Sequence, residues 1–169
     1  MPKLNKSGEV FADDWQVQEK EQDLSAEQLS AGKWLVHVKW YLAHKDTVTP
    51  SDNLGVWLDS DDEASDLGDA AKLFPVVGVN FPVFSDGRGF SIGRTLRERY
   101  GFAGELRALG GFMQDQLFYL QRCGFDAFII KEDANVESMK QSLRDFSDFY
   151  QAAVDQPTPL FRRRLAKQA

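Results

Sequence analysis

Cysteine is almost missing from this chain and histidine is scarce: the 169 residues contain one Cys and two His. A single thiol forms no intramolecular disulfide, and so few sulfur and imidazole groups do not reach the spacing of a zinc or iron–sulfur site. We therefore expect no bound metal. Cys123 precedes a glycine at the end of a helix-like segment and is interpreted as a buried structural thiol. His37 and His44 are interpreted as surface or packing residues.

The sequence also lacks a long apolar run and an excess of positive charge. No stretch approaches the roughly 18 apolar residues that span a bilayer, and the N-terminus has no apolar signal core. Lys and Arg number 20 against 26 Asp and Glu, and the net charge of −6 repels polyanions. These absences predict a cytoplasmic protein that binds neither a membrane nor nucleic acid.

What the chain does contain is a regular alternation of strand-like and helix-like segments from residue 54 onward. Short apolar, β-branched runs begin near residues 54, 76, 105 and 127, and each precedes a helix-like segment. Such alternation requires parallel strands with right-handed helical crossovers. We predict an α/β domain of four consecutive βα units that form a parallel sheet, similar to half of a (β/α) barrel. The domain covers residues 1–155, with a βα core at 54–153.

The four helices are predicted from apolar spacing and from start and stop residues. A Ser60–Glu63 capping box starts the first helix, which runs to about residue 73. The second runs to residue 100 and the third from about residue 113 to Gly124, and Gly101 and Gly124 end them. Met113 is among the residues predicted to line the third helix. The fourth carries an amphipathic stripe formed by Val136, Met139, Leu143, Phe146, Tyr150 and Ala153.

The two ends of the chain differ from this core. Residues 1–9 are polar and expected to fray, 10–11 and 15–17 are expected as short edge strands, and 33–45 is expected as a helix. Either the four strands form an open, layered α/β sheet, or the N-terminal segment, a second copy or a partner covers the exposed edges. We favour the covered sheet, for which a homodimer is one means. Residues 156–169 form a basic tail with two prolines, which is either a disordered end or a docking peptide.

Residues 81–90, which read FPVFSDGRGF, join the second strand to its helix and carry the densest polar chemistry. Ligands bind at this edge of α/β folds, and glycines, helix-start amides and an arginine can together cradle an anion. The alternative is structural: Ser85 or Asp86 caps the helix and Arg88 pairs with a nearby carboxylate. The predicted ligand-binding residues are Asn80, Ser85, Asp86, Gly87, Arg88, Gly89 and Arg107.

Other polar groups follow the strands and are expected on the same rim. Asp59 follows the first strand, Gly110 and Gly111 the third, and Lys131 the fourth. Asp115 begins the third helix and could pair with Arg88 or Arg94. No catalytic residue is identified, and the candidates are Asp86, Arg88 and Asp115.

Several contiguous phrases of the chain are distinctive. They are LGVWL (54–58), FSDGRGFS (84–91), LRER (96–99), GELRA (104–108), DQLFYL (115–120) and RCGFDAF (122–128). Together they resemble the bacterial family called domain of unknown function 934, and the resemblance covers roughly residues 54–150. It implies a role in assimilatory sulfate reduction beside the sulfite reductase haemoprotein, because family members are labelled oxidoreductases of sulfite reduction from their gene neighbourhood. It implies no catalytic residues.

Three functions remain open at this point. The first is an accessory protein that binds the sulfite reductase or its electron donor. The second is a small barrel-like enzyme or sensor that binds an oxyanion or a phosphorylated ligand at residues 81–90. The third is a reductase that uses a bound flavin or nicotinamide, although no cofactor motif is evident: Gly87, Gly89 and Gly93 do not have the dinucleotide-binding spacing.

Overall fold

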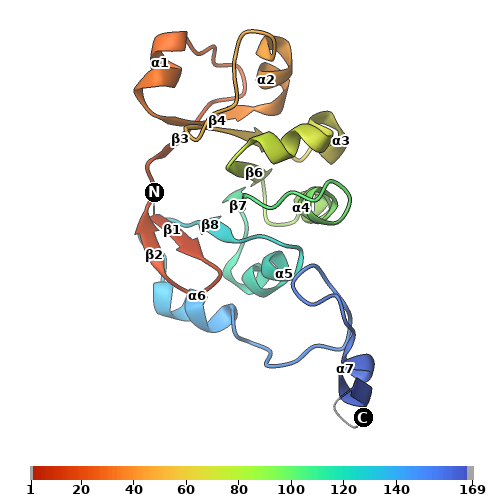
Figure 1. Cartoon of the computed structure of the whole chain (residues 1–169). Coiled ribbons are helices and arrows are strands. Elements are labelled where there is room, and N and C mark those ends of the chain that lie inside the picture. Colours follow the sequence, from red (N-terminus) through yellow and green to blue (C-terminus); the bar gives the residue numbers. More distant parts are fainter. Residues whose placement is uncertain (1, 167–169) are drawn as a thin grey trace.

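A computed structural model of the chain describes residues 2–166, so the last three residues of the basic tail lie outside the described part. Its strands form one mixed sheet, which runs from β3 and β4 at the top of Figure 1 to β1 and β2 below. The strands are β1 (Pro2–Asn5), β2 (Val10–Ala12), β3 (Trp15–Val17), β4 (Lys33–His37), β5 (Leu54–Leu58), β6 (Val76–Phe81), β7 (Glu105–Gly110) and β8 (Ala127–Ile129). Their order in the sheet is β2-β1-β8-β7-β6-β5-β4-β3.

Short helices connect and flank these strands. The 3-10 helices are η1 (Gly68–Leu73) and η2 (Gln114–Gln116). The α-helices are α1 (Ala26–Ala31), α2 (Val38–His44), α3 (Ala64–Leu67), α4 (Arg88–Glu98), α5 (Leu117–Arg122), α6 (Val136–Ser142) and α7 (Leu160–Ala166).

The predicted α/β class and the four predicted strands are confirmed, because β5 to β8 are parallel neighbours. The sheet itself is larger than four βα units. Strands β3 and β4 extend the parallel part, whereas β1 and β2 add an antiparallel edge. Both predicted edge strands, β2 and β3, lie at the edges of the sheet.

Two predictions for the N-terminal part were wrong. Residues 1–9 do not fray as a whole, because Pro2–Asn5 pairs with both β2 and β8. Residues 33–45 are not one helix, because β4 precedes α2. The run from Trp34 to Val38 is buried at every position, so apolar residues occur throughout it and some of them match helical spacing. The backbone is nevertheless extended up to His37.

The sheet is strongly curled, as its connectivity requires. Strands β2 and β3 lie at opposite edges but are separated in the chain by Asp13 and Asp14 alone. Three residue steps span at most about 11 Å, whereas a flat sheet of this strand number would be about 34 Å wide. Residues 10–17, which we call the strap, therefore lead from one edge to the other across the open side of a half-barrel.

The curled sheet has two differently filled faces. The outer face contributes Val56, Val79 and Leu106 to the main core, against which the helices pack. The inner face carries a smaller cluster that includes Leu35, Trp57 and Leu109, and Trp15 of the strap packs against it. The half-barrel is therefore filled by side chains, in the manner of a closed (β/α) barrel.

The predicted helix ends were partly correct. Gly101 and Gly124 have positive φ angles of 62° and 98° and end the second and third helices as expected. The first helix does not start from a Ser60–Glu63 box. Instead, Glu63 and Asp66 cap each other's backbone amides, and α3 is a single turn followed by η1.

The third predicted helix begins later than expected, and the fourth ends earlier. Met113 lies before η2 and is largely exposed, so it does not line the core. Helix α6 ends at Ser142, and Phe146 and Tyr150 of the predicted stripe are exposed. Beyond the helix, the Phe146 ring packs with its centroid 5.0 Å from that of Phe118 on α5.

Candidate functional site

The carboxyl ends of β5 and β6 bring two predicted rim residues together. Asn80 Nδ2 donates a hydrogen bond to Asp59 Oδ1 at 3.0 Å, and Lys20 Nζ lies 2.8 Å from Asp59 Oδ2. Burial alone would raise the pKa of Asp59, but the bonds from Lys20, Asn80 and the Ser60 amide outweigh it and lower the pKa. Asp59 is therefore an ionised acceptor at the rim.

Within residues 81–90, Arg88 binds its own loop. Arg88 Nε lies 3.0 Å from Asp86 Oδ1 and Nη2 lies 2.7 Å from Asp86 Oδ2, a two-pronged ion pair. The Arg88 amide also donates to Asp86 Oδ1, and Nη2 donates to Ser60 Oγ. These bonds, led by the Arg88 guanidinium, hold the pKa of Asp86 far below its usual range. The ion pair of the structural alternative is thus present, whereas the residue at the N-cap of α4 is Gly87 rather than Ser85 or Asp86.

The glycines of this loop have separate roles. Gly87 is the residue before α4 and has room around it, because an added Cβ would lie 3.9 Å from the Phe90 ring. Gly89 is buried, and an added Cβ would lie 2.7 Å from the Phe81 ring. Gly89 therefore lets α4 approach β6 closely, while Ser85 is exposed on the loop surface.

The other predicted site residues lie apart from Asp86 and Arg88. Asp115 is exposed on η2 and does not pair with either predicted arginine, because Arg88 binds Asp86 and Arg94 binds Glu98. Arg107 is buried on the inner face, where Asp13 of the strap binds it. Arg107 lies beside Gly78, two residues before Asn80 in β6, so it sits below the rim rather than on it.

Sequence reasoning missed a buried His–Asp pair beside this rim. His37 Nε2 lies 2.9 Å from Asp62 Oδ2, which also accepts the Asp59 amide at 2.8 Å. Lys39 Nζ lies 2.7 Å from the second oxygen, Asp62 Oδ1. Burial lowers the pKa of His37, and the Asp62 carboxylate opposes this shift without reversing it. The acidic residues that follow β5 were a sequence signal for this cluster. The signal was incomplete, because His37 lies 25 residues before Asp62 in the chain.

The inner face next to His37 is closed by further buried polar contacts. Gln18 Oε1 accepts the His37 amide at 2.8 Å, and the Gln18 carbonyl accepts Trp57 Nε1 at 3.1 Å. The His37 and Trp57 rings meet edge to face with centroids 4.5 Å apart. His37 is thus held rigidly among bonded neighbours, as in a structural pair.

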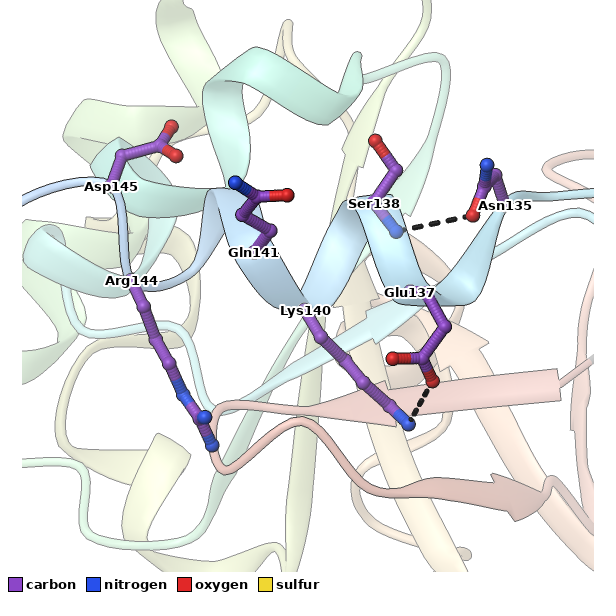
Figure 2. A pocket seen from close by; sticks show the side chains of 7 residues that line it. All are labelled: Asn135, Glu137, Ser138, Lys140, Gln141, Arg144 and Asp145. Atoms are coloured by element: carbon purple, nitrogen blue, oxygen red, sulfur yellow. Dashed lines mark hydrogen bonds and ion pairs between the residues drawn. The ribbon is translucent and has the colours of Figure 1, made fainter.

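An open hollow of about 710 Å³ beside α6 does not form a convergent site. Figure 2 shows Lys140 and Arg144 pointing to one side of the helix, whereas Gln141 and Asp145 point to the other. Lys140 is paired with Glu137 at 2.7 Å, and Asn135 caps the helix by accepting the Ser138 amide. These residues therefore stabilise α6 and do not gather around a common ligand position.

The remaining chemistry-bearing groups are placed as follows. Cys123 is buried, as predicted, and burial raises the pKa of its thiol. Among residues 2–166, no group of three or more His, Cys, Asp or Glu side chains is arranged to hold a metal ion. No helix in that part of the chain is long and apolar enough to cross a bilayer.

Comparison with known protein families finds a match over more than half of the chain. A family model described as bacterial protein of unknown function (DUF934) matches residues 55–161. No curated protein and no solved structure matches the chain.

Proposed function

The chain belongs to the bacterial DUF934 family, and from this premise we propose that it is an accessory protein of assimilatory sulfite reduction that docks on the sulfite reductase haemoprotein. The family resemblance supplies the process and the partner. The C-terminal helix α7 supplies the observation that supports docking, because it combines exposed apolar and basic side chains on an acidic protein.

Helix α7 is fixed to the preceding segment through one of its three arginines. Arg163 Nη2 lies 2.6 Å from Asp148 Oδ1, and its Nε donates to the Thr158 carbonyl at 3.1 Å. The Leu160 amide donates to the Tyr150 carbonyl at 3.1 Å. Residues 160–166 of the tail therefore form a helix set apart from the sheet, at the lower end of Figure 1.

The other arginines of α7 are directed to solvent. Arg162 and Arg164 are exposed, and no carboxylate of residues 2–166 lies within ion-pair distance of either. Phe161 and Leu165 are exposed on the same helix. Aromatic and arginine side chains that surround apolar anchors are typical of protein-binding surfaces, and an acidic partner surface complements this charge.

A pull-down with the sulfite reductase haemoprotein tests the proposal. The variant Arg162→Glu/Arg164→Glu should reduce recovery of the haemoprotein by at least tenfold, because it replaces two attractions with two repulsions. The variant Lys45→Glu/Lys72→Glu makes the same change in net charge on exposed residues outside α7 and should retain recovery. No binding by the unmodified chain, or equal loss in both variants, would contradict docking through α7.

The same preparation separates the accessory role from a reductase. A purified chain with a flavin absorption spectrum, or one that oxidises NADH or NADPH in the absence of the haemoprotein, would favour an independent enzyme. An accessory protein should give neither signal alone and should bind the haemoprotein in both oxidation states.

A further inference from the structure

The loop at 81–90 has a second, apolar side that faces away from the Asp86–Arg88 pair. Phe84 is 57% exposed on this side and borders a cleft of about 460 Å³ at the carboxyl ends of β7 and β8. The edge beyond the carboxyl ends of parallel strands is where α/β folds bind ligands. The apolar side chains of the cleft are Phe84, Phe112, Met113, Ile129, Ile130, Ala134 and Met139.

Two glycines leave the floor of the cleft without side chains. Gly110 has a φ of 85°, and a Cβ there would overlap Asn80 Oδ1 and lie 2.5 Å from the Phe81 carbonyl oxygen. The Gly111 amide donates to that same carbonyl at 2.6 Å. The backbone at the edge of the cleft therefore lies against the 80–83 segment more closely than residues with side chains would allow.

Side-chain hydrogen bonds fix the walls of the cleft in position. Gln116 Nε2 donates to the Phe84 carbonyl at 2.9 Å and fixes the loop to η2. Gln114 Nε2 donates to Ser138 Oγ at 2.7 Å and to Ser142 Oγ at 3.0 Å, which fixes η2 to α6. The cleft is thus preformed, and its volume lies within the range of small-molecule sites.

The charged residues of the lining are Lys131 and Asp133, which lie in one turn after β8. The Ala134 amide donates to the Lys131 carbonyl at 3.2 Å and closes this turn. No ion pair among residues 2–166 involves either side chain. One free cation and one free anion therefore border an apolar cavity whose two methionines adapt readily to a ligand's shape.

We propose that this cleft binds an apolar α-amino acid, whose carboxylate meets Lys131, whose ammonium meets Asp133 and whose side chain enters among the aromatic and methionine residues. Lys131 and Asp133 are both exposed, so a ligand with both charges can form two ion pairs where a ligand with a single charge forms one. The site is separate from the docking surface on α7, so each proposal can fail without the other.

Methionine NMR offers a direct test, because the chain has three methionines and two of them line the cleft. The full chain is labelled with ¹³C in the Met methyl groups, and the signals are assigned with Met113→Leu and Met139→Leu. L-Phenylalanine is the probe, because its ring shifts nearby methyl signals. Both cleft signals should move saturably and with one common Kd.

Charge variants and charge analogues then test the orientation. Lys131→Gln and Asp133→Asn should each weaken L-phenylalanine binding by about three- to tenfold, whereas Lys45→Gln should not. N-acetyl-L-phenylalanine should lose sensitivity to Asp133→Asn, and L-phenylalaninamide should lose sensitivity to Lys131→Gln. Shifts that do not saturate up to the solubility limit, or equal affinity for all three probes, would overturn the proposal.

Discussion

Arg107 Nη1 lies 2.9 and 3.0 Å from the two carboxylate oxygens of Asp13, across the inner side of the curled sheet. Arg107 is on the central strand β7 and is 1% exposed, whereas Asp13 belongs to the strap. Arg107 Nε also binds Glu105, which in turn accepts Lys3 Nζ at 3.0 Å. The guanidinium lies 5.3 Å from the Trp15 ring. One buried cation thus joins the strap, the central strand and β1.

The variant Asp13→Ala should destabilise the fold by about 3 kcal/mol, because it leaves the Arg107 charge buried with Glu105 as its remaining acid. Urea unfolding measures the loss. The neighbouring variant Asp14→Ala is a matched control, because Asp14 is exposed and pairs with Lys33, so its loss should lower the stability far less. Equal losses in the two variants would show that the Asp13–Arg107 contact does not secure the strap.

The variant Gly110→Ala should destabilise the fold by about 2 kcal/mol or more. The added methyl group would overlap Asn80 Oδ1 at a φ of 85°, which a residue with a side chain rarely adopts. Gly87→Ala is the comparison, because its φ is −82° and its Cβ would enter free space. Gly87→Ala should be neutral or slightly stabilising, and thermal unfolding of both variants distinguishes the two cases.

Local rules were enough to predict the parallel strands, and Gly101 and Gly124 marked helix ends correctly. Contacts between distant residues decided the parts that failed. Strand β1 reads as polar because Lys3 points to the inner face, where its partner Glu105 is 102 residues away. The same limit applies to the site. The residue types of Asp86 and Arg88 fit an anion-binding loop and a mutual ion pair equally well. Only the positions of the two side chains in the folded chain distinguish these two alternatives.

The His37–Asp62 pair should make stability depend on pH near neutrality. Because burial lowers the pKa of His37, the unfolded chain binds the proton more readily than the folded chain. The contribution of neutral His37 to the free energy of unfolding is fully present above the pKa of histidine in the unfolded chain, about 6.5. It is lost as the pH falls toward the lower pKa of His37 in the folded chain. Urea unfolding between about pH 7.5 and 5 should show this decline.

Substitution of either histidine separates its contribution from the rest of the protein. His37→Gln should be less stable at neutral pH but should have a flatter profile between about pH 7 and 5. His44→Gln should keep the pH dependence of the unmodified chain. If the profile of His37→Gln were as steep as that of the unmodified chain, the pH dependence would have to come from other groups.

Asp86 should compete with an external anion for Arg88, since it already binds Nε and Nη2. In Asp86→Asn the guanidinium loses its ionic partner, so sulfate should give its half-maximal rise in Tm at a concentration about three- to fivefold lower than for the unmodified chain. In the double variant Asp86→Asn/Arg88→Gln, the sulfate concentration for the half-maximal rise in Tm should no longer be lowered. A rise in Tm that is the same in all three proteins would place any sulfate binding away from residues 81–90.

The Asp148–Arg163 pair should control the order of α7 without controlling the stability of the sheet. Asp148→Asn weakens the contact to Arg163 Nη2 but leaves the arginine and its bond to the Thr158 carbonyl in place. Chymotrypsin should then cleave after the exposed Phe161 several-fold faster, because proteolysis reports local opening. The urea midpoint of the domain should stay unchanged, since an exposed pair contributes little to stability. Asp145→Asn provides the matched control on the same segment. If cleavage were equally fast in both variants, the helix would be held by its backbone contacts rather than by Arg163, and docking through α7 would not depend on this pair.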